Sequence, residues 1–357
     1  MKFLFLDSWV RNRAEGSGSA VAITGLAGGL RSLGHSVDFL HPRYVFRSLD
    51  VTRLVYNLTL KPRVESVADR FDVVVGFDYD GWALSFDPAR RFVVALKGVA
   101  ADERRFEVGW SRLRFALWAY LEKRNARSAD RVFVTSEYSE RRAIEAYDLR
   151  PELVRLSPEG IDRDIAAGGP DESSSLIPFR DPIILSVARQ YRRKDTATLI
   201  RAVPALLAAI PDIGLRIVGD GPELARTRRL AERLGVEDRV SFLGSLDSVS
   251  TLRNEYASAS VFCLPSLQEG FGIVLLEAMS HGLPIVATHC GAVPEVAPHG
   301  ETSLLVPPRD PDALAHALVR ILTDSNLAAQ LGTAGKQRVC RYGWSAAARA
   351  FVEGLND

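Results

Sequence analysis

The sequence has few cysteines, no long apolar run and almost no excess of charge, and each shortage excludes a class of protein. Its three cysteines, Cys263, Cys290 and Cys340, are scattered and lack metal-ligand spacing, which favours buried thiols in a reducing compartment over a disulfide frame. No stretch approaches the roughly 18 apolar residues that span a bilayer. The apolar start is interrupted by Asp7, too soon for a signal peptide. A formal net charge of +1 gives no general reason to expect nucleic acid as a partner. We therefore expect a cytoplasmic protein. Peripheral binding at the inner membrane surface is an alternative that the sequence leaves open.

The length of 357 residues exceeds the size at which single hydrophobic cores usually stop growing, so we expect two domains. Apolar strands alternate with helical patterns in two series, which is typical of parallel sheets covered by helices on both faces. We predict an N-terminal domain over 1–160, a Gly-, Pro- and Ser-rich linker over 161–181, a second domain over 182–340, and a C-terminal helix over 341–357 that packs back toward the N-terminal domain. The expected fold class is α/β, with two doubly wound, Rossmann-like domains that face each other across a cleft.

The segment over residues 262–295 reads as strand, glycine-bearing turn, helix, strand and turn. Gly270 and Gly272 let a ligand approach backbone N–H groups just before a helix begins. Glu269 precedes this helix, and Glu277 lies eight positions farther on, about one turn inside it. From spacing alone, the two carboxylates either grip separate parts of one extended ligand or serve as a helix cap and a solvated helix residue.

Cations follow the first strand of the second series, at Arg189 and in the loop that contains Arg192, Arg193 and Lys194. Positive groups at the carboxyl end of a strand, just before a helix, suit a diphosphate. A solvated basic loop would have the same composition. The glycine turn at 219–222, after the next strand, needs only a structural explanation, because two glycines permit a tight turn and proline fits the first helical position.

A glycine loop also follows the first strand of the chain, with Gly16 and Gly18 before a helix and Asp38 about 20 residues on. This pattern resembles a dinucleotide-binding fingerprint, which leaves a nicotinamide oxidoreductase as an alternative. Val21 at the third glycine position argues against it. The D-x-D triplet at 78–80 follows a strand but lacks the further ligands of a metal site.

Several motifs together resemble the GT-B glycosyltransferases, and within them the retaining, nucleotide-sugar-dependent enzymes of glycosyltransferase family 4. The resemblance covers the whole second domain and rests on Arg189 with Lys194, on IVGDGP, on FLG at 242–244, and on PSLQEGFGIVLLEAMSHGLPIVAT followed by GAVPE. In the first domain it is looser and rests on the glycine loop, on a Gly-His pair before a strand, and on the stretch over 122–142.

The resemblance implies an enzyme that moves a hexosyl or related group from a nucleotide diphosphate sugar to an acceptor hydroxyl and keeps the anomeric configuration. It assigns Glu269 to the transferred sugar and Glu277 to the nucleotide ribose. It assigns Arg189 and Lys194 to the departing diphosphate, where fixed cations stabilise developing negative charge. The full donor-binding set that it implies, beyond these catalytic residues, is Gly244, Gly270, Phe271, Gly272, Ile273 and Glu277.

The acceptor side departs from the family pattern. Gly16 and Gly18 match a loop that closes over phosphate or acceptor, whereas Lys97 stands where many relatives carry a histidine. We expect Lys97 to hold a phosphate or carboxylate of the acceptor, and a structural surface lysine is the alternative. Glu159 stands where relatives often have asparagine, a change that we expect only to alter the hinge.

The implied reaction needs neither a metal nor another cofactor, because Arg189 and Lys194 take the place of the metal. The expected partners are a nucleotide sugar and an acceptor that is a glycan, a lipid or a small metabolite. The segment Arg104–Arg127 interleaves apolar and basic residues, so it either contacts an anionic membrane surface or packs its aromatic residues inside. The alternatives to an active transferase are a non-catalytic nucleotide-sugar-binding subunit and a sugar-nucleotide epimerase of the same architecture.

Overall fold

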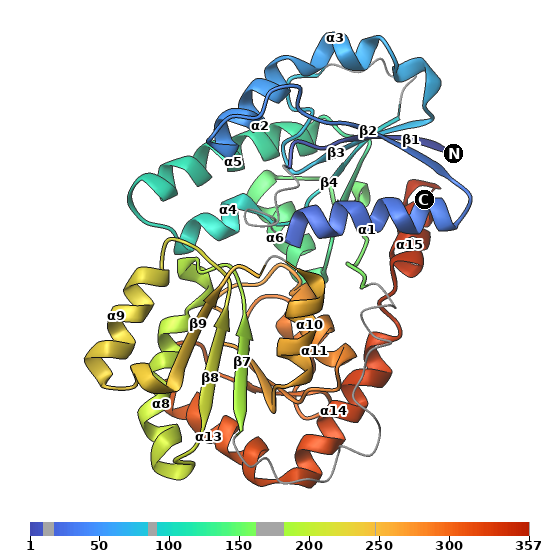
Figure 1. Cartoon of the computed structure of the whole chain (residues 1–357). Helices are drawn as coiled ribbons and strands as arrows, with labels where there is room; N and C mark the ends of the chain where they lie inside the picture. The colour runs from blue at the N-terminus through green and yellow to red at the C-terminus, as the bar shows by residue number, and fades with distance from the viewer. Residues whose placement is uncertain (10–17, 85–90, 162–181, 247, 357) are drawn as a thin grey trace. The chain divides into compact units, whose positions relative to one another are not determined.

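The structure, a computed structural model, describes residues 1–9, 18–84, 91–161, 182–246 and 248–356. The chain divides into two compact units, one formed by Met1–Gly160 with Gly343–Asp357 and the other by Ile161–Tyr342. Each unit contains one six-stranded parallel sheet with helices around it (Figure 1). The predicted α/β fold class with two parallel sheets is therefore confirmed. Apart from Ile161, the predicted linker lies outside the described residues.

Unit 1 is built on a sheet covered by helices on both faces. Its strands, in sheet order, are β2 (Ser36–Leu40), β1 (Lys2–Leu6), β3 (Val73–Phe77), β4 (Arg91–Ala95), β5 (Arg131–Val134) and β6 (Val154–Leu156). Its helices are α1 (Gly18–Ser32), α2 (Leu49–Leu58), α3 (Leu60–Glu65), α4 (Ala100–Glu103), α5 (Gly109–Arg127), α6 (Glu137–Tyr147) and α15 (Trp344–Asn356). Side chains along a strand alternate between faces, so Phe3 and Phe5 pack with α1 and α15 while Leu4 and Leu6 pack with α2, α3, α5 and α6.

The C-terminal helix α15 belongs to unit 1 and packs against α1 (Figure 1). Glycine allows this close approach, because a Cβ at Gly25 would lie 2.0 Å from the Trp344 ring and one at Gly29 would lie 2.2 Å from the Trp344 carbonyl oxygen. Farther along α15, the Phe351 ring lies 4.1 Å from the Phe133 ring on β5, measured between centroids. Helix α15 is thus part of the core of the unit that begins the chain.

Unit 2 repeats this architecture with a different sheet. Its strands, in sheet order, are β12 (Ser303–Val306), β11 (Ile285–Thr288), β10 (Val261–Leu264), β7 (Ile183–Val187), β8 (Gly214–Val218) and β9 (Val240–Gly244). Its helices are α8 (Thr196–Ala209), α9 (Leu224–Leu234), α10 (Val249–Ala257), α11 (Ile273–Ser280), α12 (Val293–Val296), α13 (Pro311–Thr323) and α14 (Ser325–Val339). Helices α8, α9 and α13 pack on one face, and α10, α11 and α12 pack on the other (Figure 1). The strand order reverses between β10 and β7, the position where doubly wound sheets bind ligands at their carboxyl edge.

Two features differ from the sequence-based expectations. Helices α2 and α3 are not predicted from the sequence. In α2 the β-branched residues Val51, Thr52 and Val55 lower helix propensity, and α3 is short and contains Pro62. Cys263 and Cys290 are buried as predicted, but Cys340 is exposed. Among the described residues, no helix is both long enough and apolar enough to cross a membrane.

Candidate active site

Two of the predicted site residues meet where the neighbouring strands β7 and β10 end. Lys194 ends a short 3-10 turn after β7, and Glu269 lies between β10 and α11. The Nζ atom of Lys194 lies 2.6 Å from Oε1 of Glu269, and the Ser266 hydroxyl donates to the same oxygen at 2.7 Å. The Leu267 N–H donates to the Arg193 carbonyl at 2.7 Å. Backbone and side-chain bonds therefore join the two loops at one edge of the sheet.

The charges around Glu269 keep its carboxylate ionised. Burial by itself raises the pKa of a carboxyl group, and Glu269 is only 4% exposed. The positive charges of Lys194 and Arg193, together with hydrogen bonds from Lys194 and Ser266, outweigh this burial and lower the pKa of Glu269. A negative charge is thereby fixed beside the Lys194 cation.

The turn around Glu269 requires glycine at two positions. Gly272 has φ = 95°, a left-handed conformation, and caps the N-terminus of α11, where the first backbone N–H groups have no partner within the helix. A Cβ at Gly291 would lie 2.2 Å from the Glu269 carbonyl oxygen, which accepts a hydrogen bond from the Ala292 N–H at 3.0 Å. The GAVPE segment therefore packs against the backbone of Glu269, and the predicted donor contacts at 270–273 lie in this turn.

Glu277 lies one turn into α11, where a tyrosine from α10 holds it. Its Oε2 accepts a hydrogen bond from the Tyr256 hydroxyl at 2.7 Å. Burial raises the pKa of Glu277, and the hydrogen bond from Tyr256 lowers it in part. Tyr256 also stacks on the His281 ring, 5.2 Å away between centroids, and His281 Nδ1 lies 2.9 Å from the Glu277 carbonyl oxygen. These contacts fix the position of Glu277 on the helix.

Arg189 and Gly244 lie at the ends of β7 and β9, on the same edge of the sheet. The Arg189 guanidinium lies 5.7 Å from the centroid of the Tyr191 ring. Gly244 has φ = 65°, and its carbonyl accepts a hydrogen bond from the Gly219 N–H at 2.7 Å. A Cβ at Gly219 would lie 2.1 Å from the Ala188 carbonyl oxygen. The glycine turn after β8 thus has a structural reason, since it lets the strand ends approach each other.

Lys97, the predicted acceptor residue, is buried in unit 1, which contradicts the alternative of a surface lysine. Its side chain is 6% exposed, and its Nζ lies 3.0 Å from Oε1 of Glu159. The Lys97 N–H donates to Asp78 Oδ1 at 2.9 Å. Burial raises the pKa of Glu159; Lys97 opposes this shift and Asp78 adds to it, and the pKa stays above its usual value. The expectation that Glu159 only alters the hinge is therefore wrong, because Glu159 is the charge partner of Lys97.

The D-x-D triplet is occupied by protein donors. Asp80 accepts hydrogen bonds from the Ser8 N–H at 2.9 Å and from the Asn57 amide at 2.8 Å. Arg53 lies 3.7 Å from Asp78 and 3.8 Å from Asp80. Among the described residues, no group of three or more His, Cys, Asp or Glu side chains is placed to hold a metal ion. Independence from metal stays a prediction.

The two glycines of the N-terminal loop are placed only in part. Gly16 lies outside the described residues, and Gly18 is the exposed first residue of α1. Their role in closing over phosphate or acceptor stays a prediction.

Known proteins resemble this chain along nearly its whole length. A family model described as Glycosyltransferase Family 4 matches residues 16–165, and one described as Glycosyl transferases group 1 matches residues 171–338. A GDP-mannose-dependent alpha-(1-6)-phosphatidylinositol monomannoside mannosyltransferase of Mycobacterium tuberculosis is 32% identical over 72% of this chain and 69% of its own length. The chain belongs to glycosyltransferase family 4.

Of two further relatives of this family 4 glycosyltransferase, one has the same printed name and one a different name. The Mycolicibacterium smegmatis enzyme of the same name is 36% identical over 70% of this chain and 65% of its own length. A D-inositol 3-phosphate glycosyltransferase of Corynebacterium jeikeium is 33% identical over 63% of this chain and 56% of its own length. The matched part thus spans between about half and two thirds of these relatives.

Two solved structures show the fold of this glycosyltransferase. Sucrose-phosphate synthase from Thermosynechococcus elongatus matches with a TM-score of 0.79 at 24% identity, covering 99% of this chain and 98% of that one. HepE from Anabaena, solved with UDP and glucose, matches with a TM-score of 0.75 at 22% identity, covering all of both chains. At these identities the likeness establishes the GT-B fold alone.

Gln268, next to Glu269 in the loop, carries a buried polar atom whose lack of a partner the sequence motifs do not reveal. It is 2% exposed, and its buried Oε1 atom has no hydrogen-bond partner among the described residues. Such an unsatisfied group costs about 1–3 kcal/mol. Because Gln268 directly precedes Glu269, a ligand O–H or N–H group at this edge would satisfy it. In the sequence, Gln268 is distinguished only by its position directly before Glu269.

Proposed function

We propose that this family 4 glycosyltransferase moves a hexose from a nucleotide diphosphate sugar to a hydroxyl group, with retention of configuration and without a metal ion. The observation that carries the proposal is the 2.6 Å ion pair between Lys194 and Glu269, at the carboxyl edge where β7 and β10 end. This edge is where doubly wound sheets bind ligands, and it lies within the segment that the group 1 family model matches.

The proposed chemistry uses opposite charges where the reaction develops them. As the bond from the anomeric carbon to the diphosphate oxygen breaks, its electron pair stays on the diphosphate, which Lys194 and Arg189 stabilise. The carboxylate of Glu269 stabilises the positive charge on the sugar ring. The acceptor oxygen bonds to the anomeric carbon on the face that the leaving group vacates, and its proton passes to the departing diphosphate oxygen. Retention of configuration follows from this same-face exchange.

The named relatives suggest the first substrates to test. The mannosyltransferases are GDP-mannose-dependent and act on phosphatidylinositol monomannoside by name, and HepE was solved with UDP and glucose. We propose GDP-mannose as donor, and as acceptor a polyol or sugar hydroxyl attached to a lipid phosphate.

A lipid-borne acceptor would bring the enzyme to a membrane, and the exposed face of α5 suits that location. Trp110 (79% exposed), Leu113 (62%), Leu117 (52%) and Tyr120 (62%) follow one another at spacings of three, four and three, so they form one apolar stripe. Phe115, in contrast, is buried. We define the α5 stripe as these four exposed residues.

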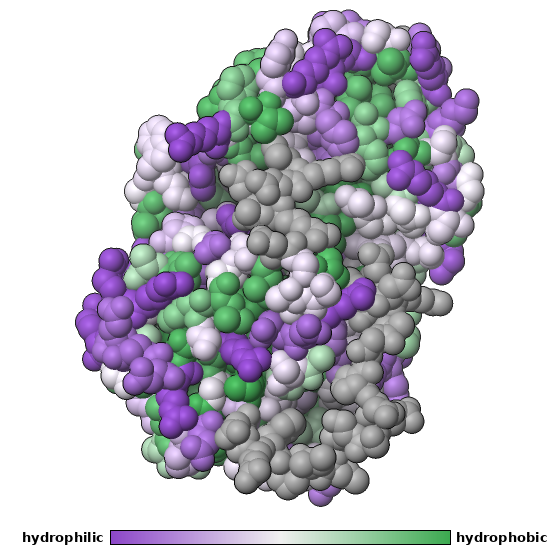
Figure 2. Space-filling model, in the orientation of Figure 1, coloured by the Kyte–Doolittle hydropathy of each residue, from purple (hydrophilic) through white to green (hydrophobic). Residues whose placement is uncertain are grey.

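The surroundings of the α5 stripe favour an anionic lipid surface. The segment Arg104–Arg127 contains seven cations, and both of its carboxylates, on Glu107 and Glu122, are buried. Helix α2 adds three exposed apolar residues at 51, 54 and 58, and an ion pair of 3.4 Å from Arg114 to Asp50 connects α2 with α5. Apolar side chains gather on the surface where these two helices lie (Figure 2). Each basic group near an anionic membrane contributes about 1 kcal/mol of attraction.

Transfer is tested by offering GDP-mannose, UDP-glucose and related nucleotide sugars with a lipid extract and measuring released nucleoside diphosphate. We expect release that depends on the acceptor, persists in EDTA and is about 10²–10³-fold slower in E269Q. The anomeric configuration of the product, read by NMR, should equal that of the donor. A non-catalytic subunit would bind nucleotide and release none, and an epimerase would convert the donor without an acceptor.

Membrane contact is tested by flotation with vesicles that contain phosphatidylglycerol or phosphatidylinositol. Wild-type protein should float, whereas a variant with serine at Trp110, Leu113, Leu117 and Tyr120 should stay at the bottom. The variant L234S/V249S, which removes two exposed apolar side chains of unit 2, should float as wild type does. Equal flotation of all three proteins would contradict the membrane role of the α5 stripe.

A further inference from the structure

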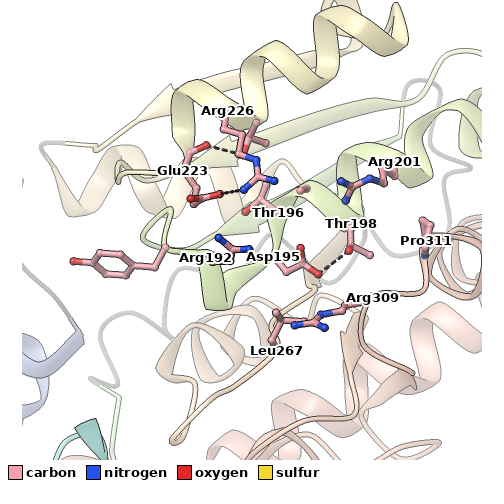
Figure 3. A pocket seen from close by; sticks show the side chains of 13 residues that line it. Arg192, Asp195, Thr196, Thr198, Arg201, Glu223, Arg226, Leu267, Arg309 and Pro311 are labelled. Atoms are coloured by element: carbon pink, nitrogen blue, oxygen red, sulfur yellow. Dashed lines mark hydrogen bonds and ion pairs between the residues drawn. The ribbon is translucent and has the colours of Figure 1, made fainter. Parts of the chain in front are cut away.

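A second candidate site lies in unit 2, beside the donor edge. It is a hollow of about 400 Å³ (Figure 3). Its lining includes Arg192, which begins the 3-10 turn after β7, residues at or near the N-terminal ends of α8, α9 and α13, and Leu267. Its lining includes none of the charged residues predicted for the donor, which are Arg189, Lys194, Glu269 and Glu277. The volume falls within the range of about 300–1,000 Å³ that is typical of small-molecule sites.

The hollow is strongly cationic. Four arginines line it against two carboxylates, and these six residues are Arg192, Arg201, Arg226, Arg309, Asp195 and Glu223. Glu223 pairs with Arg226 at 3.4 Å. Within the described part of the chain, no hydrogen bond or ion pair holds the side chains of Arg192, Arg201 and Arg309. We refer to this hollow as the arginine pocket.

Asp195 lies between two of these arginines. Its Oδ2 accepts a hydrogen bond from the Thr198 hydroxyl at 2.7 Å. Burial raises the pKa of Asp195, while Thr198, Arg201 and Arg309 lower it in part, so both guanidinium groups act on the same carboxyl. The close view shows Arg201 and Arg309 directed toward the space around Asp195 (Figure 3). One carboxylate cannot balance the three unpaired arginines of the pocket.

Two residues of the arginine pocket also hold unusual backbone conformations. Asp195 has φ = 44° and Arg309 has φ = 63°, values that cost a side-chain-bearing residue free energy and recur at binding sites. Glycine would adopt these conformations without cost, but the chain has charged side chains at both positions, and both line the arginine pocket.

The chemistry of the lining favours a phosphate group over other ligands. The planar guanidinium fork binds phosphate oxygens through paired, charge-assisted hydrogen bonds. Thr198 and Glu223 add a hydroxyl and a carboxylate, which suit the hydroxyl groups of a small polar metabolite. The volume exceeds what a single phosphate ion fills, so the remaining space fits the rest of such a molecule.

We propose that the arginine pocket binds the phosphate group of a small phosphorylated metabolite, at a site separate from the donor site. The proposal does not depend on the transfer reaction. Because Leu267 lines the pocket and its N–H bonds to the Arg193 carbonyl at 2.7 Å, the ligand would lie against the loops that carry Lys194 and Glu269.

The test is a calorimetric titration of inorganic phosphate and of a hexose 6-phosphate into the full chain at constant ionic strength. It is made in an R189Q/K194Q background, which removes the predicted diphosphate cations of the donor edge and leaves the arginine pocket intact. We expect the hexose phosphate to bind and to bind more tightly than inorganic phosphate. Equal affinities for the hexose phosphate and for inorganic phosphate would contradict a metabolite site and indicate a site for free phosphate. Adding R201Q/R309Q should weaken binding at least about tenfold, because charge-assisted hydrogen bonds are about twice as strong as neutral ones.

Two further variants keep the test falsifiable. The pair R233Q/R239Q removes two exposed charges of the same unit outside the pocket and should change the affinity less than about twofold, because salt screens distant charges. D195N keeps the shape of the side chain, tolerates a left-handed backbone and removes a competing negative charge, so it should tighten binding. No binding in the background protein, unchanged affinity in R201Q/R309Q, an equal loss in R233Q/R239Q, or weaker binding in D195N would each overturn the proposal.

Discussion

The two units each carry a buried lysine–glutamate pair at the carboxyl edge of a parallel sheet, yet the two pairs differ in their electrostatic surroundings. In unit 2, Lys194 and Glu269 lie 2.6 Å apart, and in unit 1, Lys97 and Glu159 lie 3.0 Å apart. The pKa of Glu269 is lowered and the pKa of Glu159 is raised, although burial raises both.

The neighbours of each pair explain the difference. Arg193 adds a second positive charge beside Glu269, whereas Asp78 adds a second negative charge beside Glu159. The edge of unit 2 therefore has an excess of positive charge, which suits an anionic ligand. At the edge of unit 1, the positive charge of Lys97 is outweighed by the two acids Glu159 and Asp78. The same pair of residue types thus leaves a net positive edge in unit 2, which suits the proposed donor diphosphate, and a net negative cluster in unit 1, where the acceptor role of Lys97 stays a prediction.

The largest expected effect is on the stability of unit 1. K97M leaves Glu159 buried without its partner, which costs about 3–5 kcal/mol. The double variant K97M/E159Q removes both charges and should unfold close to wild type. Burial raises the folded-state pKa of Glu159, and K97M removes the lowering effect of Lys97, so the stability of K97M should fall as pH rises above the unfolded pKa of about 4.3. Denaturant unfolding at several pH values measures this.

The control for that cycle is the exposed pair of Lys61 and Glu65, 3.9 Å apart. K61M should change stability by less than about 1 kcal/mol, as exposed pairs do. If K97M and K61M had equal effects, burial of the Lys97–Glu159 pair would not contribute to the stability of unit 1.

The next effect is on catalysis in unit 2. E269Q removes the carboxylate that we propose to stabilise the sugar cation, so kcat should fall about 10²–10³-fold, the scale for one electrostatic group in an active site. The loss of stability should be smaller than in K97M, because Lys194 is more exposed than the partners of the unit 1 pair (14% against 6% and 5%) and Gln still accepts the hydrogen bonds from Ser266 and Lys194. E237Q changes an exposed glutamate of the same unit and should leave kcat unchanged. An intact kcat in E269Q would contradict the proposed role.

A smaller effect concerns Glu122, a second buried acid of unit 1. Burial, with the charge of Asp78, raises its pKa to about 8, and it accepts hydrogen bonds from the Tyr147 hydroxyl and the Ala100 N–H. A raised folded-state pKa means that stability is lost as pH rises from the unfolded value, about 4.3, through about 8. E122Q stays neutral, so at about pH 9 its melting temperature should exceed that of wild type by about 2–4 °C per kcal/mol gained.

At about pH 5 the same substitution should give little or no increase, because Glu122 is then protonated in the folded protein. E152Q, at an exposed site of unit 1, should show no increase at either pH. An equal gain from E122Q at both pH values would argue against the anionic surroundings of this edge.

The smallest expected effect is that of Y256F. This variant removes the hydrogen bond to Glu277, which is worth about 0.5–1.5 kcal/mol, so the Kd of the nucleotide should rise a few-fold. Y44F, at an exposed tyrosine, should leave the Kd unchanged. An unchanged Kd in Y256F would contradict a role of the Tyr256–Glu277 hydrogen bond in nucleotide binding.

Much of the donor side could be predicted from the sequence because its residues lie in short motifs. Glu269 and Lys194 lie in the loops that follow β10 and β7, and neighbouring parallel strands end at the same edge, so the strand order brings the two loops together. Gln268 and Tyr256 could not be identified, because neither a buried amide nor a helical tyrosine has a pattern that distinguishes it from core packing.

The acceptor side could be predicted far less well because its contacts span long separations. Glu159 lies 62 positions from Lys97, and no local spacing indicates that the two side chains meet. Arg53 and Asn57 lie on α2, a helix that intrinsic propensity does not predict because it contains several β-branched residues. The family resemblance does not supply these contacts, since Lys97 departs from its pattern.

The most direct test of a donor site at the edge of unit 2 is a calorimetric titration of GDP and UDP into wild type, K194Q and E269Q. If the edge of unit 2 binds the donor diphosphate, K194Q should weaken binding at least about tenfold. E269Q should bind the nucleotide as tightly as wild type or more tightly, because Lys194 is released from its ion pair, although its kcat is about 10²–10³-fold lower. Equal affinity of wild type and K194Q, or equal losses in K194Q and E269Q, would contradict the assignment of this edge as the donor site.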